Sequence, residues 1–150
     1  MDPQFPIGKF HGPGAPLEPA ARAAYIDEIE RMPGALRALA GGMHDAQLDT
    51  PYRPGGWTVR QVVHHIPESH MNAYVRFKLA LTEEEPTIKP YDEGLWAELD
   101  DARTAPIEVS LVLLEALHRR WVLMLESLSA ADIARKFRHP ELGVVSLEKM

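Results

Sequence analysis

Histidine supplies most of the chemistry that this sequence offers, because imidazole titrates near neutral pH and binds transition metals. The chain has seven histidines, namely His11, His44, His64, His65, His70, His118 and His139. It has no cysteine, which excludes disulfides, thiolate nucleophiles, cysteine-ligated zinc and iron–sulfur clusters. It also lacks a His-Glu-x-x-His motif, a P-loop and a Rossmann fingerprint. A site built on histidine is therefore the chemistry to look for.

The densest group of histidines, His64, His65 and His70, shares one predicted helix with Glu68. Residues three apart share a helix face, so Glu68 accompanies His65, but His-x-x-Glu is only a two-ligand fragment. Catalytic zinc needs about three protein ligands. A helical projection places His70 near the centre of the apolar face, His65 on its flank and His64 on the solvent side. Two interpretations stay open for His65 and His70: a metal ligand, or the commoner hydrogen-bonded core histidine.

The other polar candidates give weaker signals. His118 has helical neighbours of mixed polarity, which favours a surface position or an ion pair. His139 precedes Pro140 in a predicted turn. The pair Tyr91-Asp92 either lines the mouth of a pocket or forms a simple turn. Spacing alone assigns none of them to a site.

Three long helices are predicted to position these residues. The first covers about residues 20–40 and ends at a pair of glycines, with a kink at Pro33. The second begins with a capping box, in which Thr58 is the N-cap and Gln61 reaches back, and it extends to about Leu81 with a bend at Pro67. The third has Pro106 in its first turn and an apolar stripe that continues to Leu128.

The connections between these helices are predicted to be irregular. Residues 47–56 form a loop, and residues 86–101 a long connection with a short helical piece near Leu95. Ser129 caps a short helix through about Lys136, and residues 144–145 are extended. Ser146 is another predicted N-cap, but the sequence stops at Met150. Because three antiparallel helices leave a seam open, we expect a fourth helix that this chain lacks.

Length and charge limit the class of protein. The 150 residues suit a single domain, with residues 1–19 as an extended arm and residues 20–150 as an all-α helical bundle. The 22 acidic and 16 basic side chains give a formal charge of −6, which argues against a nucleic-acid binder and a polybasic membrane surface. No apolar run has the length of a membrane span, and the N-terminus is not a secretory signal. These features predict a soluble, cytoplasmic domain.

A long motif resembles a known family. Residues 47–65 read QLDTPYRPGGWTVRQVVHH and closely resemble the YfiT-like branch of the DinB superfamily. The same branch resembles this chain at its Pro-Ile-Gly start and at four later stretches. Those stretches are residues 69–74 (SHMNAY), 76–79 (RFKL), 88–92 (IKPYD) and 139–141 (HPE). The resemblance covers nearly the whole chain, and members are described as metal-dependent hydrolases, with some relatives as bacillithiol S-transferases.

The resemblance implies a four-helix bundle, usually a homodimer, with one zinc or nickel ion per subunit held by three histidines. The first ligand matches His65. The other two lie in a His-x-x-x-His arrangement on the last helix, which follows the position of Met150, so the site as the family builds it is incomplete here. Where the family has Ala-Asp, this chain has Pro67-Glu68, and Glu68 is the candidate group that orients His65.

The function that this resemblance implies is hydrolysis of a small molecule by a metal-activated water. Transfer of a low-molecular-weight thiol of the bacillithiol type to an electrophile needs the same ligands, so sequence does not separate the two reactions. A third alternative is a non-catalytic helical interaction module, which the acidic charge and the open seam allow.

Overall fold

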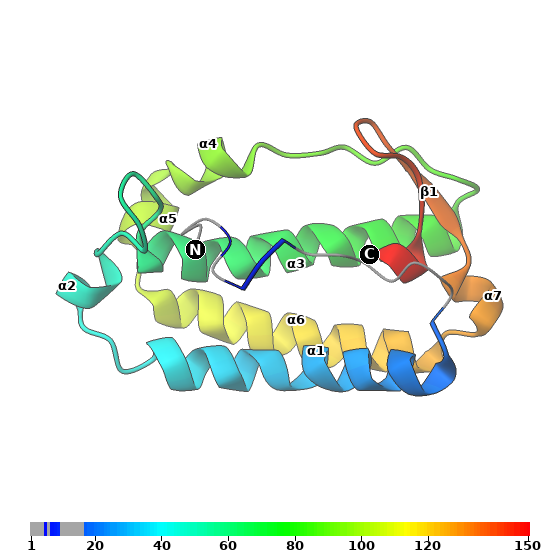
Figure 1. Ribbon diagram of the computed structural model, residues 1–150, viewed down its shortest axis with the longest axis horizontal. Helices are drawn as coiled ribbons and strands as arrows, with labels where there is room; N and C mark the ends of the chain where they lie inside the picture. The colour runs from blue at the N-terminus through cyan, green and yellow to red at the C-terminus, as the bar shows by residue number, and fades with distance from the viewer. Residues whose placement is uncertain (1–4, 6, 10–16) are drawn as a thin grey trace.

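The computed structural model describes residues 5, 7–9 and 17–150, and most of the predicted arm lies outside them. Three long helices dominate the described chain: α1 (Pro19–Ala40), α3 (Val59–Thr82) and α6 (Ile107–Ser127). They lie side by side, and α6 packs against both α1 and α3 (Figure 1). The predicted all-α class is confirmed, and none of the helices in the described part is both long and apolar enough to cross a membrane.

The start of α3 follows from its capping box, as the sequence predicts. The Thr58 hydroxyl accepts a hydrogen bond from the backbone N–H of Gln61 at 3.2 Å, and the Gln61 amide oxygen accepts one from the N–H of Thr58 at 2.9 Å. This exchange satisfies two donors that an uncapped helix leaves free. Pro67 is buried inside α3, and Pro33 is buried inside α1. Both helices continue through their prolines, so the register of the residues on either side is kept.

The short elements depart from prediction in several places. Helix α4 (Glu93–Ala97) is the short helical piece predicted near Leu95, whereas α2 (Asp45–Leu48) extends into the predicted loop and α5 (Asp100–Thr104) continues past the end of the predicted connection. Helix α7 (Ala130–Ile133) is shorter than predicted, because Lys136 already belongs to a strand whose next residue, Phe137, is buried. That strand, β1 (Lys136–His139), pairs antiparallel with β2 (Gly143–Ser146), and the 3-10 turn η1 (Leu147–Lys149) follows.

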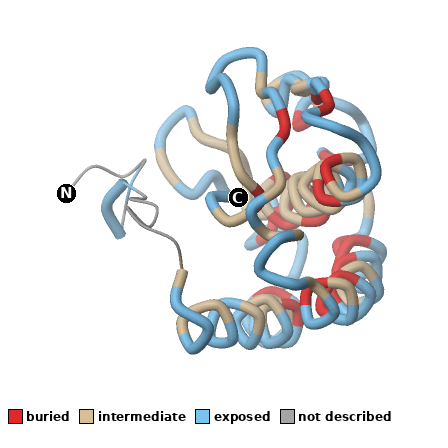
Figure 2. Tube along the Cα trace, turned by 90° about the vertical axis from the view of Figure 1, so that its right-hand side faces the viewer, coloured by how far each residue is buried: buried red, intermediate tan, exposed pale blue. Residues whose placement is uncertain are grey.

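The core divides into two clusters along the helices. One surrounds Trp121 and includes Phe77 of α3, Phe137 of β1 and Leu147 of η1, so the hairpin closes one end of the helices. The other lies toward α2 and gathers Val63, Leu111 and neighbouring apolar residues. Buried residues occur mainly along the mutually facing sides of the helices, as Figure 2 shows. Burial of these side chains is the main favourable term in the stability of such a fold.

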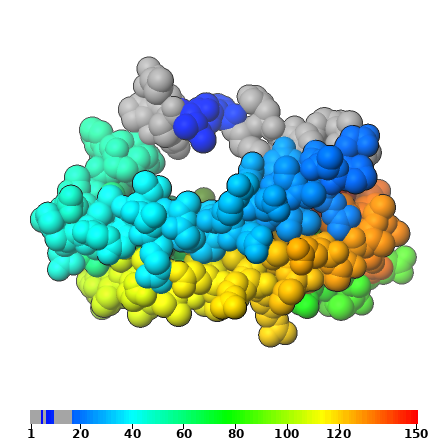
Figure 3. All heavy atoms as spheres, turned by 90° about the horizontal axis from the view of Figure 1, so that it is seen from below, coloured from blue at the N-terminus to red at the C-terminus, as the bar shows by residue number. Residues whose placement is uncertain are grey.

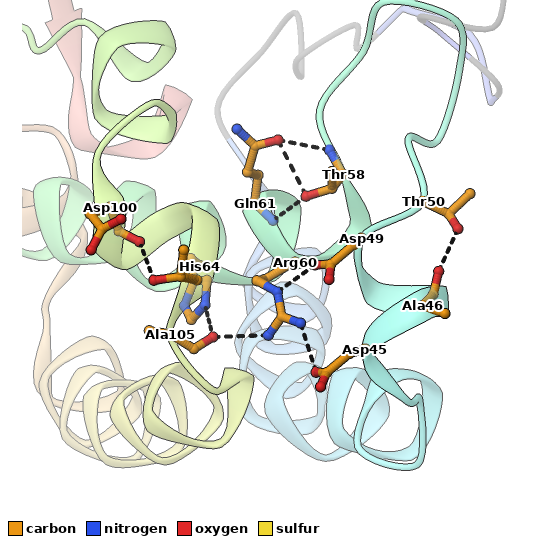
Figure 4. A network of polar contacts seen from close by, with 11 residues as sticks. Asp45, Ala46, Asp49, Thr50, Thr58, Arg60, Gln61, His64, Asp100 and Ala105 are labelled. Atoms are coloured by element: carbon orange, nitrogen blue, oxygen red, sulfur yellow. Dashed lines mark hydrogen bonds and ion pairs between the residues drawn. The ribbon is translucent and has the colours of Figure 1, made fainter.

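A buried arginine connects three elements at the other end (Figure 4). Arg60 is 5% exposed. Its guanidinium donates to Asp49 at 2.7 Å, to Asp45 at 2.8 Å and to the carbonyl oxygen of Ala105 at 3.1 Å. Hydrogen bonds from a charged donor are the strong ones, and here they join α2, the start of α3 and the C-cap residue of α5.

His64 is buried, so the prediction that it faces solvent is wrong. Its Nδ1 lies 2.7 Å from the Ser110 hydroxyl and its Nε2 lies 3.0 Å from the carbonyl oxygen of Ala105. A carbonyl only accepts, so Nε2 carries the hydrogen and Nδ1 accepts from Ser110. The helical projection assumed one buried face, whereas α5 and α6 cover this side of α3 as well.

His118 is also buried, at 1% exposure, where the sequence predicted a surface position or an ion pair. Its Nδ1 donates to the carbonyl oxygen of Ile29 at 2.6 Å, so the neutral ring accepts at Nε2, 2.6 Å from Nδ1 of His70. Trp121 lies edge-on to both rings, with ring centroids 6.0 Å apart in each case. Of the two interpretations of His70, a metal ligand or a hydrogen-bonded core histidine, the structure supports the second.

Replacing Arg60 by methionine is expected to lower the free energy of unfolding by about 2 kcal/mol, because bonds from a buried charged donor are lost. The cost stays moderate because Asp45 and Asp49 are exposed and regain water. Urea denaturation measures it. The matched control is Arg103→Met, which breaks the exposed pair with Glu98 and should cost no more than about 0.5 kcal/mol. Equal losses in the two variants would contradict the structural role of Arg60.

Acid is expected to destabilise the metal-free chain between about pH 6.5 and pH 4. Burial and the nearby rings of His118 and His65 lower the pKa of His70 from 6.5 to about 4 in the folded chain. The unfolded chain thus binds more protons in this interval, so stability present above pH 6.5 is lost as the pH falls.

The variant His70→Gln should show a shallower loss of stability over the same interval. Urea midpoints at pH 7.5, 6 and 5 give the comparison, and the carboxylates are common to both proteins, so the difference in slope isolates His70. Identical slopes would show that His70 takes up its proton equally in the folded and unfolded chains.

Candidate functional site

His65 is the predicted metal ligand, and it lies half-buried on α3 one residue after the buried His64. Its ring packs edge-on against Trp57, with centroids 4.9 Å apart. Its Nδ1 is buried and has no hydrogen-bond partner among the residues described. Burial lowers the pKa of His65, and the nearby carboxylate of Glu93 opposes that shift only in part. The imidazole is therefore neutral at physiological pH, which is the form that binds metals.

Glu68, the candidate that orients His65, lies one turn further along α3. Burial raises the pKa of its carboxyl, and the negative charge of Asp101 raises it further. Asn72 donates to the backbone carbonyl of Glu68 at 2.9 Å, and within residues 17–150 the Glu68 carboxylate itself forms no hydrogen bond or ion pair with another residue. No hydrogen bond joins Glu68 to His65 in the described part of the chain, so its role stays a prediction.

The neighbouring histidines do not complete a metal site with His65. His64 bonds to Ser110 and Ala105, and His70 bonds to His118. Across residues 17–150, no three histidine or carboxylate side chains come together in a group that could hold a metal ion. One ligand fits the implied metal, and the described residues do not supply the rest of the set.

A second group of polar side chains lines a cavity, and the sequence predicted only some of its members. Tyr91 and Asp92 line a cavity of about 510 Å³ together with Arg76, Glu93 and His139. The pocket interpretation of Tyr91-Asp92 is thereby confirmed. Arg76 and His139 occurred in the motif stretches, but nothing in their sequence spacing shows that α3 and the β1–β2 turn meet there.

This cavity lies near the predicted ligand. Glu93 lines the cavity and is close enough to His65 to raise its pKa. Burial raises the pKa of Tyr91, Glu93 and Glu68 add to that shift, and Ser69 opposes it. Tyr91 therefore keeps its proton at neutral pH and can donate a hydrogen bond. Helices α1 and α6 run together along the edge of the molecule opposite α4 (Figure 1), and this edge faces the viewer in Figure 3.

Comparison with known proteins identifies close relatives. "Putative metal-dependent hydrolase OB0782" of Oceanobacillus iheyensis is 52% identical over 149 residues, which are 99% of this chain and 86% of that protein. "Putative metal-dependent hydrolase BcerKBAB4_2443" of Bacillus mycoides is 53% identical over 146 residues, which are 97% of this chain and 83% of that protein.

A solved structure and a family model agree with these relatives. YfiT from Bacillus subtilis, described as a probable metal-dependent hydrolase with an unusual four-helix bundle topology, matches with a TM-score of 0.95 at 45% identity. The match covers 99% of this chain and 85% of YfiT, and it confirms the predicted bundle class. The model of the DinB superfamily matches residues 28–150. With both the sequence and the fold in agreement, this chain belongs to the YfiT-like branch of the DinB superfamily.

Proposed function

We propose that this chain is the larger part of a metal-dependent hydrolase and that His65 is one ligand of its metal, a single zinc or nickel ion. The observation that carries the proposal is the neutral, half-buried ring of His65, whose buried Nδ1 has no partner in the described chain. A buried polar atom without a partner costs free energy, and coordination of a metal would satisfy this one. The names of relatives at 52% and 53% identity support the reaction class.

The residues around His65 prepare it for this task. Trp57 packs against the ring and restricts its rotation, and burial holds the ring in its neutral form. Glu68 shares its face of α3 and has a carboxyl that burial has made more basic, so it is the proposed acceptor that orients the imidazole. When bound by three neutral histidines, the metal supplies an activated water as nucleophile.

In the proposed three-histidine site His65 is one ligand, and the resemblance to the family implies that the other two lie in a His-x-x-x-His arrangement on a further helix. Relatives are longer than the aligned part, since this chain covers 86% and 83% of two of them. Their names favour hydrolysis over thiol transfer and over a non-catalytic interaction module. The small-molecule substrate, the homodimer and the cytoplasmic location stay predictions.

The metal content of the purified 150-residue chain tests the ligand count. A single histidine does not retain zinc or nickel through dialysis, so elemental analysis should find far less than one ion per folded chain. About one ion per chain would show that a complete site exists within these residues and would overturn the proposal. Sequencing the gene past the codon for Met150 is the second arm, because a following His-x-x-x-His helix is expected and an immediate stop codon contradicts the enzyme.

In the gene product that carries the proposed fourth helix, Glu68→Gln is expected to weaken metal binding about 10-fold, because the amide orients His65 less well than the carboxylate. Competition with a chromophoric chelator measures the affinity. The matched control is Glu84→Gln at an exposed residue just after α3, which should leave the affinity unchanged. An unaltered affinity in Glu68→Gln would remove Glu68 from the site while leaving His65 in place.

A further inference from the structure

Two adjoining cavities of about 510 Å³ and 450 Å³ share Arg76, Tyr91 and Asp92 as lining residues. They lie between the second half of α3, the connection that returns above it, and the turn between β1 and β2 (Figure 1). Backbone bonds fix the connection to β1: the N–H of Ile88 donates to the carbonyl of Arg138 at 3.0 Å, and the N–H of Arg138 donates to Pro86 at 2.8 Å. The walls are thus held in place without a ligand.

One group of lining residues donates hydrogen bonds. Arg76 is half-buried, and its guanidinium forms no hydrogen bond or ion pair with any other residue that the structure describes. Nδ1 of His139 accepts from the backbone N–H groups of Glu141 at 3.2 Å and Leu142 at 3.4 Å, so the neutral ring carries its hydrogen on Nε2. With the Tyr91 hydroxyl, the cavity offers three donors suited to a carboxylate.

The other group of lining residues is acidic. Asp92, Glu93 and Glu141 line the larger cavity, and one oxygen of Asp92 accepts from the N–H of Leu95 at 2.8 Å. The two cavities thus carry charges of both signs, with Asp92, Glu93 and Glu141 as carboxylates and Arg76 and Lys89 as cations, so neither a simple anion nor a simple amine matches the whole lining. A ligand that carries both an ammonium and a carboxylate satisfies both sets of residues. The described carboxylates and His139 do not converge to hold a metal.

The smaller cavity adds an apolar requirement. Val75, Leu79, Ile88 and Trp96 contribute apolar surface to its walls, beside the polar side chains of Asn72 and Lys89. The centroid of the Trp96 ring lies 4.5 Å from that of Tyr91. An aliphatic group of a few carbons placed there is removed from water, at about 25 cal/mol per Å² of apolar surface. The shared residues Arg76 and Asp92 then meet the charged groups at the junction of the two cavities.

We propose that these two cavities form a binding subsite for an amino-acid-like zwitterion with an aliphatic side chain, its carboxylate on Arg76 and its ammonium among Asp92, Glu93 and Glu141. Because the Glu93 carboxylate lines this subsite and is close enough to His65 to act on its pKa, a substrate held here lies near His65. That last link rests on the proposed function. The subsite itself does not.

Nuclear magnetic resonance titration of the metal-free chain tests the subsite, with the indole N–H of Trp96 as reporter. L-leucine is the probe, and three relatives each remove one feature: L-leucinamide lacks the carboxylate, N-acetyl-L-leucine lacks the ammonium, and glycine lacks the aliphatic group. Saturable shifts with L-leucine are expected, with binding at least about 10-fold weaker for each of the three relatives. Absence of a saturable shift with L-leucine overturns the proposal.

Variants separate the subsite from general surface binding. Arg76→Gln should abolish the preference for L-leucine over L-leucinamide, whereas Arg119→Gln on the exposed face of α6 should retain it. Equal binding of N-acetyl-L-leucine and L-leucine would show an anion site and contradict the zwitterion. If Arg76→Gln still prefers L-leucine over L-leucinamide, Arg76 does not bind the carboxylate, and that part of the proposal is contradicted. Since no metal is present, failure here leaves the metal proposal standing, and failure of the metal proposal leaves this result unaffected.

Discussion

The carbonyl oxygen of Ala105 is the acceptor on which the arrangement of α3 depends. It receives hydrogen bonds from Arg60 at 3.1 Å and from His64 at 3.0 Å, both on the first turns of α3. The two hydrogen bonds hold the start of α3, both along its axis and in its rotation, against the short link between α5 and α6. With His64 turned toward Ala105, the next residue, His65, is rotated by about 100° and meets Trp57. The candidate ligand is thus positioned by its buried neighbour.

The sequence predicted the long helices well because their signals are local. Thr58 and Gln61 form their capping box within one turn, and the long helices end within two residues of the predicted limits. The burial of His64 and His118 could not be predicted this way. Each depends on an acceptor that is distant in the chain, Ala105 in one case and Ile29 in the other, and a helical projection contains no information about such acceptors.

In the candidate site, too, the residues marked by a local sequence signal were predicted, and those brought together by the fold were not. His65 was found through a contiguous motif, and its neighbour Trp57 belongs to that motif. The cavity was found only in part, because Tyr91-Asp92 are adjacent whereas Arg76 and His139 approach them through the fold. The hairpin that brings His139 there was predicted only at residues 144–145, since β1 has one buried residue, Phe137, and a four-residue strand carries little periodicity.

The proposed metal ligand, His65, and the cavity are formed largely by different residues, so catalysis and substrate selection can depend on different parts of the protein. A metal polarises what it touches but does not choose a substrate by its remote groups, so selectivity comes from contacts elsewhere. Arg76 lies on α3, and Tyr91 and Asp92 lie on the connection that is hydrogen-bonded to β1. Their positions therefore do not depend on the groups proposed to hold a metal. The side chain shared by both regions is Glu93, which lines the cavity and acts on the pKa of His65. Glu93 is therefore the residue through which a group bound in the cavity would act on His65, the proposed metal ligand.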